Sequence, residues 1–155
     1  MNTISSNTVN VKQDVEGGKF LSFFLGKEEY AIEILRVQEI IGLLPIVPVP
    51  KMPEYIRGII NLRGNIVPIM CIRKRFHLPV VPDTPETCIV VVQHNGKHMG
   101  IVVDKVSEVV DVKAELIEDV PDFGQVVSSD YLMGIAKSKQ NVRMLLDLAH
   151  VVYGE

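Results

Sequence analysis

The sequence has no tryptophan and few other aromatic residues: of its 155 residues, 5 are phenylalanine and 4 are tyrosine. Valine, isoleucine and leucine must therefore form most of any core, and single-stranded nucleic acid would find few rings on which to stack its bases. There are only 2 cysteines, too few for a disulfide framework. We therefore expect a cytoplasmic protein with reduced thiols.

Neither sign of charge dominates. The chain has 16 Lys and Arg against 19 Asp and Glu, and its formal net charge is −3. No basic cluster is larger than the three residues 73–75, whereas nucleic-acid-binding proteins usually present a basic face. A tandem β-barrel that binds nucleic acid is therefore kept only as the alternative function.

Long apolar runs are also missing. None reaches the roughly 20 residues that a membrane-spanning helix needs. Residues 1–18 are polar and lack the apolar segment of a signal peptide. Nothing in this stretch offsets the entropy cost of ordering it, so we expect a disordered N-terminal tail.

The most informative feature of the chain is an internal repeat. Residues 55–72 recur without a gap at residues 131–148, where Tyr-Ile-Arg-Gly-Ile-Ile is matched by Tyr-Leu-Met-Gly-Ile-Ala. A weaker similarity relates residues 26–41 to residues 96–110, with one residue of slack. The ordered part is therefore a tandem duplication of one small β-rich unit. Two such units leave a seam between them, which favours a docking module over an enzyme with one deep pocket.

Short apolar runs separated by Gly, Pro and Asn predict strands joined by tight turns. Asn95-Gly96 is the strongest hairpin signal, because both residues tolerate positive φ. Arg63-Gly64 and residues 26–29 mark two further hairpins. We expect one helical turn after Pro53, ending at Gly58, and short helices over residues 113–118 and 148–153. Many short strands at this spacing predict an all-β fold of two packed small barrels.

Four residues resemble a zinc site by type: Cys71, His77, Cys88 and His94. Ligands six residues apart in a strand lie about 20 Å from each other, whereas each must approach zinc to roughly 2.0–2.3 Å. The sequence also lacks a Gly-x-Ser-x-Gly elbow and a glycine-rich phosphate loop. We therefore expect no metal, no cofactor, no catalytic residue and no enzymatic activity.

Two features are not explained by packing alone. Arg63 lies at a hairpin tip between two apolar strands, and its counterpart region, residues 137–140, is polar and has diverged. Such divergence suggests that one copy retains a particular partner, although a solvated turn residue is an equally good explanation. Val37 and Glu39 alternate along a predicted strand and so share a face. That combination suits docking of a helix with an apolar stripe and basic flanks, while protection of an edge strand would also explain Glu39.

The sequence resembles the CheW-type chemotaxis coupling proteins. The most specific match is Tyr-Ile-Arg-Gly-Ile-Ile-Asn-Leu-Arg-Gly-Asn-Ile-Val-Pro-Ile at residues 55–69. Residues 20–23, 26–32, 37–40, 100–106 and 144–148 also fit the family, so that the resemblance runs from about Phe20 to Val152. The chain departs from the family at Cys71, where Asp is common.

The resemblance implies two packed SH3-like five-stranded β-barrels in one domain, residues 19–153. The barrels would cover roughly residues 19–80 and 85–153, and exchange of strands between them stays open. It also implies a non-catalytic adaptor that couples transmembrane chemoreceptors to the regulatory domain of the chemotaxis histidine kinase CheA, at the inner face of the membrane. The receptor-binding positions implied by the motifs are Val37, Glu39, Gly58, Arg63, Gly100 and Val109. The kinase-binding surface is not placed.

Overall fold

The protein is built mainly from β-strands in two packed sheets, which confirms the predicted fold class. The computed structural model describes residues 17–120, 129–138 and 140–154, so the expected tail lies almost wholly outside the described residues. The strands are β1 (Gly18–Leu25), β2 (Glu28–Glu33), β3 (Val37–Gly42), β4 (Ile56–Leu62), β5 (Asn65–Cys71), β6 (Cys88–His94), β7 (Lys97–Val103), β8 (Lys105–Val112), β9 (Ile117–Glu118), β10 (Leu132–Lys137) and β11 (Val142–Leu146). The helical elements are η2 (Ile34–Arg36), α2 (Ile72–Arg75), η3 (Ala114–Leu116), η4 (Ser129–Tyr131) and α3 (Leu148–Tyr153).

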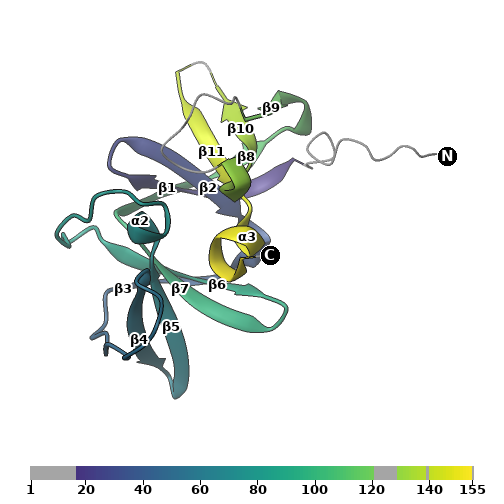
Figure 1. The fold of residues 1–155 in the computed structure, drawn as a ribbon. Coiled ribbons are helices and arrows are strands. Elements are labelled where there is room, and N and C mark those ends of the chain that lie inside the picture. The colour runs from purple at the N-terminus through teal and green to yellow at the C-terminus, as the bar shows by residue number, and fades with distance from the viewer. Residues whose placement is uncertain (1–16, 121–128, 139, 155) are drawn as a thin grey trace.

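Each sheet takes strands from both copies of the repeat. One sheet has the order β8-β1-β2-β11-β10-β9 and the other has the order β3-β6-β7-β5-β4. The β1–β2 hairpin of the first copy thus lies between β8 and β11 of the second, and the β6–β7 hairpin lies between β3 and β5 of the first (Figure 1). The exchange of strands that the sequence left open is therefore present in the sheet topology.

The sheets differ from the expected barrels in detail. The first has a sixth strand, the two-residue β9, beside the five expected. Within the described residues, the two edge strands of each sheet do not pair with each other in a ladder. In the five-stranded sheet, the free side of β4 is instead covered by Val47, whose N–H donates to Ile59 O at 2.9 Å and whose O accepts from Ile59 N at 2.9 Å.

Two hairpins have the tight turns predicted from the sequence. Asn95 and Gly96 both have positive φ, 51° and 77°, between the paired residues His94 and Lys97. Arg63 and Gly64 also have positive φ, 51° and 87°, at the tip of the β4–β5 hairpin between the paired residues Leu62 and Asn65. Positive φ at both central residues is the geometry whose twist matches that of the flanking strands. The Arg63 side chain is thereby held at the outermost point of its hairpin.

One core joins the two sheets. Its aromatic centre runs from Phe23 to Tyr30, Phe76 and Tyr131, with ring centroids separated by 5.9, 5.8 and 5.1 Å. These residues come from both copies, and the same cluster includes buried residues of α2 and α3. Units of this size bury little surface alone, so the shared core makes the two copies one folding body.

Arg75 connects the helices of the two copies. Its Nε donates to Val151 O at 2.7 Å and its Nη2 donates to His150 O at 3.2 Å, both on α3. The guanidinium also lies 4.6 Å from the ring centroid of Tyr55 and 5.2 Å from that of Tyr131, two equivalent residues of the repeat. A cation near the C-terminal carbonyls of a helix is stabilising, so Arg75 fixes the seam between the copies.

Two predicted helices need correction, and one helix was not predicted. The helix expected over residues 113–118 is limited to η3 at Ala114–Leu116, and Ile117–Glu118 forms strand β9 instead. The helical turn expected between Pro53 and Gly58 does not form: Ile56 N–H donates to Pro53 O at 2.9 Å, and the chain then enters β4 at once. Pairing of Ile56 with Met70 of β5 requires an extended chain there. The short helix α2 was not predicted, although its repeat counterpart α3 was predicted with the bounds observed.

Candidate functional site

The structure brings Glu39 and Arg63 together. Glu39 is on β3, at one edge of the five-stranded sheet, and Arg63 is at the tip of the hairpin that contains β4, the opposite edge. Arg63 Nη2 donates to both carboxylate oxygens of Glu39. The sheet therefore curves enough for a side-chain ion pair to link its two edges.

This ion pair is exposed at the arginine end. The Arg63 side chain is 66% exposed and that of Glu39 is 22% exposed. The hydrogen bond from Arg63 to Glu39 raises the pKa of the arginine, which stays charged. Exposed ion pairs contribute little to folding because water and salt screen them. The pair is therefore better explained by the orientation it gives Arg63 at the surface than by stability.

Val37 and Glu39 do not share a face, contrary to the prediction. Val37 pairs with Val92 and Glu39 pairs with Val91, with a register shift between them, so the two side chains lie on opposite faces of the sheet. Exposure alternates along β3: Val37, Glu39 and Ile41 are half-buried, whereas Gln38 and Ile40 are exposed. Both Val37 and Glu39 are thus half-buried, although on opposite faces of β3. Val37 packs against the shared core, and Ile40, which is 45% exposed, is the apolar residue that β3 offers to solvent.

Gly58 and Gly100 are buried and have packing roles. A Cβ at Gly58 would lie 2.3 Å from Val47 O, and its φ of 154° disfavours any other residue. A Cβ at Gly100 would lie 2.5 Å from Ile69 Cδ1 and 2.8 Å from Ile89 Cγ2. Contacts this short force the surroundings to shift. Both glycines therefore permit close approach of neighbouring segments inside the five-stranded sheet.

Val109 belongs to the other sheet. It is 50% exposed on β8, an edge strand of the six-stranded sheet, where it pairs with Leu21. The six positions implied by the family motifs are therefore distributed over an exposed ion pair with Val37 beside it, two packing glycines and one exposed valine on a separate sheet.

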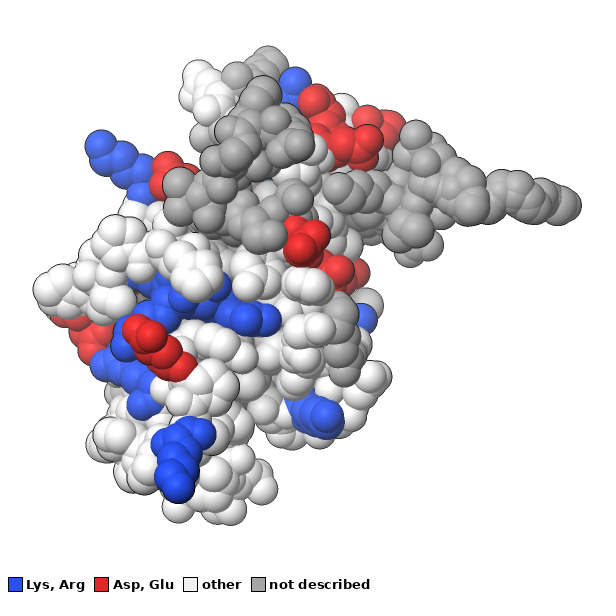
Figure 2. Space-filling model, viewed as in Figure 1, with Lys and Arg blue, Asp and Glu red and all other residues white. Residues whose placement is uncertain are grey.

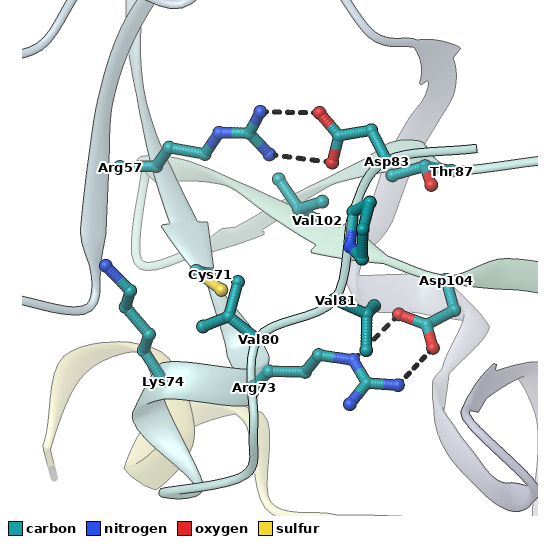
Figure 3. Close-up of a pocket in the computed structure, with 11 residues that line it drawn as sticks. Arg57, Cys71, Arg73, Lys74, Val80, Val81, Asp83, Thr87, Val102 and Asp104 are labelled. Carbon is teal, nitrogen blue, oxygen red and sulfur yellow. Dashed lines mark hydrogen bonds and ion pairs between the residues drawn. The ribbon is translucent and has the colours of Figure 1, made fainter. Parts of the chain in front are cut away.

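A cleft of about 330 Å³ lies beside α2 and is shown in Figure 3. It is lined by Arg57, Cys71, Arg73, Lys74, Val80, Val81, Pro82, Asp83, Thr87, Val102 and Asp104. Arg57 pairs with Asp83 at 2.7 Å. Arg73 Nε donates to Asp104 at 3.0 Å, and this arginine holds the pKa of Asp104 below its usual value.

These two arginines fix the segment that crosses the cleft. Besides pairing with Asp104, Arg73 donates to Pro79 O at 2.8 Å. Each of the two guanidinium groups is thus already paired with a carboxylate of the same chain, Arg57 with Asp83 and Arg73 with Asp104. The sequence gave no signal for these contacts, because Arg57 and Asp83 are 26 positions apart and Arg73 and Asp104 are 31 apart.

The four residues weighed as zinc ligands do not form a metal site. Within residues 17–120, 129–138 and 140–154, no group of three or more His, Cys, Asp or Glu side chains could hold a metal ion. Cys71 and Cys88 are both free thiols. They lie at one end of β5 and of β6, opposite Val102 and Val103 of the intervening strand. Burial raises the pKa of Cys88, which disfavours the reactive thiolate.

Charge on the visible face is mixed. Figure 2 shows basic side chains gathered between α2 and α3, with an acidic one directly beside them and further acidic groups nearby. This pattern does not form the continuous basic face that nucleic-acid binding usually requires. In addition, none of the helices among the described residues is long and apolar enough to cross a membrane.

The fold and this surface define a class of protein. Two sheets built from a duplicated unit share one core, and an oriented ion pair stands at their surface. Such an arrangement suits a scaffold that binds other proteins along its surface. The chain belongs to the family whose model is described as the CheW-like domain, which matches residues 19–155, and it is a chemotaxis adaptor protein.

Similar proteins support this assignment. The chain is 37% identical over 139 residues to the chemotaxis protein CheW of Klebsiella aerogenes, a match that covers 90% of this chain and 84% of that one. It is 34% identical over 127 residues to the Helicobacter pylori protein of the same name, covering 82% and 75%.

The crystal structure of the scaffolding protein TtCheW from Thermoanaerobacter tengcongensis matches with a TM-score of 0.81 and 31% identity, covering 90% of this chain and 96% of that chain. Nothing in the family or these relatives supports the nucleic-acid alternative.

Proposed function

We propose that this adaptor couples transmembrane chemoreceptors to the histidine kinase CheA, without catalysing a reaction itself. It would hold the receptor's cytoplasmic helical tip and the kinase's regulatory domain in one complex at the inner face of the membrane. A change in receptor conformation would then bias the kinase between active and inactive states. Coupling of this kind is a difference in affinity between two states, typically about 1–3 kcal/mol.

The observation that carries the proposal is the oriented pair of Glu39 and Arg63. Its exposure leaves it little role in folding. An arginine held rigidly at a hairpin tip loses less side-chain entropy on binding than a free one. Ile40 and Ile66, which are 45% and 62% exposed, add apolar area on the same edge strand and hairpin. A receptor helix with an apolar stripe and charged flanks fits this combination.

The six positions then take different parts in docking. Arg63 and Glu39 would contact the receptor directly, and Val37 would act by anchoring the start of β3 to the shared core. Gly58 and Gly100 would act by keeping the sheet closely packed, because both are buried. Val109 would contribute from the other sheet.

Co-sedimentation of the adaptor with receptor-containing membranes and CheA tests the proposal. The wild-type protein should form a ternary complex that stimulates kinase activity, and Arg63→Asp should weaken it about tenfold or more. Lys19→Asp is the matched control, since Lys19 makes an exposed pair with Asp111 at 2.9 Å on the other sheet. If the wild-type protein forms no ternary complex, the proposal is wrong.

A further inference from the structure

Asn61 lies at a position of β4 where packing does not require it. Its neighbours Ile60 and Leu62 are buried in one hydrophobic cluster. Asn61 itself is exposed and pairs with Ile66, which is 62% exposed. Asparagine is also among the residues that strands disfavour. Neither burial nor strand preference therefore explains an asparagine two positions before the tip of this hairpin.

The Asn61 side chain is bonded to the turn that follows. Its Oδ1 accepts a hydrogen bond from the backbone N–H of Gly64 at 2.8 Å. Gly64 lies outside both strands, because β4 ends at Leu62 and β5 begins at Asn65. The bond therefore links the tip of the hairpin to β4 independently of the pairing between β4 and β5.

This bond stabilises a turn whose first residue has an unusual backbone conformation. Arg63 has a φ of 51°, a value that residues with a side chain rarely adopt. Asn and Asp are enriched at such φ values because their short side chains can bond to nearby backbone groups. The arginine side chain has no hydrogen-bond acceptor and cannot make that bond. The amide oxygen of Asn61 makes it instead, from the neighbouring strand.

The second copy of the repeat has a different residue at this position. The equivalent of Asn61 is Lys137, whose Nζ pairs with Glu118 Oε2 of β9 at 2.8 Å. A lysine side chain has no acceptor for a backbone N–H. The residue equivalent to Arg63 is also a lysine in the sequence. The asparagine and the arginine therefore occur together, in the copy that forms the ion pair with Glu39.

A fixed turn limits where the Arg63 guanidinium can point. Its Nη2 donates to both carboxylate oxygens of Glu39, on the opposite edge of the sheet. If the turn moved, the arginine would lose backbone freedom as well as side-chain freedom when it docked against a partner. Such ordering costs binding free energy. By holding the turn, Asn61 reduces this cost before any partner arrives.

We propose that Asn61 is a positioning residue for docking at the Glu39–Arg63 surface. Its amide oxygen holds the Arg63–Gly64 turn in the conformation that presents the guanidinium, and Asn61 itself does not touch the partner. The effect on the turn rests on the contacts within the chain, whereas the identity of the partner, a chemoreceptor helical tip, rests on the proposed function.

Nuclear magnetic resonance of the full chain tests the effect on the turn without a partner. In Asn61→Ala the Gly64 amide loses its acceptor and should exchange with water at least about threefold faster than in wild type. Gln93→Ala is the matched control, because Gln93 is exposed and precedes the Asn95–Gly96 turn by the same two positions. It should leave the exchange of Gly64 unchanged. An unchanged rate in Asn61→Ala overturns the proposal.

Titration with a soluble cytoplasmic fragment of a chemoreceptor tests the effect on docking. Asn61→Ala should weaken binding about three- to tenfold, as expected when a pre-ordered side chain becomes free, and Gln93→Ala should leave it unchanged. In an Arg63→Ala background, Asn61→Ala should have no further effect, because residues that act through one another do not contribute additively. Equal weakening in both backgrounds would show that Asn61 acts independently of Arg63 and would overturn its positioning role.

The outcomes separate this inference from the proposed function. Normal affinity of Asn61→Ala, beside a wild-type protein that binds, overturns the positioning role alone. Absence of binding by the wild-type protein overturns the proposed function, and the docking role of Asn61 with it. Circular dichroism establishes that each variant is folded. Asn61→Val, which removes the same acceptor and suits an exposed strand position, repeats both tests if Asn61→Ala does not fold.

Discussion

The Arg63 guanidinium and the Glu39 carboxylate link the two outer edges of the five-stranded sheet, one from a hairpin tip and the other from β3. The contact joins residues 24 positions apart in the chain. The two edge strands of this sheet form no ladder with each other, yet the curvature of the sheet brings side chains from both edges into contact.

Exchanging the charges of Arg63 and Glu39 tests whether Arg63 touches the partner protein or only holds the two sheet edges in position. Arg63→Glu should weaken complex formation at least tenfold while leaving the free energy of unfolding nearly unchanged, because the arginine is exposed and water and salt screen the pair. Combining it with Glu39→Arg restores the ion pair in reverse. If Arg63 touches the partner, the double variant should still fail to bind in the pull-down. Full recovery of binding would mean that the pair acts only by bracing the two edges.

Substitution of Gly58 tests whether it contacts a partner or allows packing. Gly58→Ala places a Cβ against Val47 O at a residue whose φ is 154°, a value that residues with a side chain rarely adopt. We therefore expect a loss of about 1–3 kcal/mol of stability. Gly42→Ala is the control, because a Cβ there meets nothing within 4 Å. Urea denaturation measures both. Normal stability of Gly58→Ala together with lost binding would assign Gly58 to the contact surface instead.

Removal of the Arg75 guanidinium should loosen the seam between the copies. Arg75→Gln loses the cation above Tyr55 and Tyr131 and the hydrogen bonds to α3, and we expect a loss of about 1–3 kcal/mol of stability. Lys74→Gln, on the same helix but exposed, should change stability by less than about 0.5 kcal/mol. Hydrogen exchange should speed up most in α3; equal acceleration throughout the chain would contradict a local role for Arg75.

Tyr30 should make the protein sensitive to alkaline pH. Burial raises its pKa from 10.0 to about 12. The unfolded chain releases this proton more readily than the folded one, so the stability due to neutral Tyr30 is complete below pH 10 and is lost as pH rises toward 12. Tyr30→Phe should therefore lose less stability than wild type between pH 9 and pH 11.5 in urea denaturation. Parallel loss in both proteins would show that other groups cause the alkaline sensitivity.

Much of the fold could be read from local patterns. Asn95-Gly96 and Arg63-Gly64 are tight turns because few dipeptides accept positive φ twice. The helix over residues 148–153 formed as predicted. Its counterpart α2 was not predicted, because the sequence similarity between the copies ends at Ile72, where α2 begins. The turn after Pro53 failed as a helix because pairing with β5 overrode the local preference of the chain.

The candidate site was harder to predict. Family motifs pointed to six positions, but sequence alone does not separate a buried packing glycine such as Gly100 from an exposed contact residue such as Arg63. The Glu29–Arg143 pair joins positions 114 apart, and no local pattern predicts such a contact. On β8 the family motifs pointed to Val109 alone, and the similarity between residues 26–41 and 96–110 was too weak to predict more of that edge.

By itself, the sequence determined that the chain is a duplicated β-rich unit, because alternation and turn residues act over a few neighbouring positions and the internal similarity can be read along the chain. Only the tertiary structure decided that the copies exchange hairpins and that the motif positions lie on two sheets, with Arg63 and Glu39 on one and Val109 on the other. These are consequences of packing: a hairpin pairs with whichever edge lets the common core close, and that choice depends on segments distant in the sequence, as in the pairing of Phe20 with Val110.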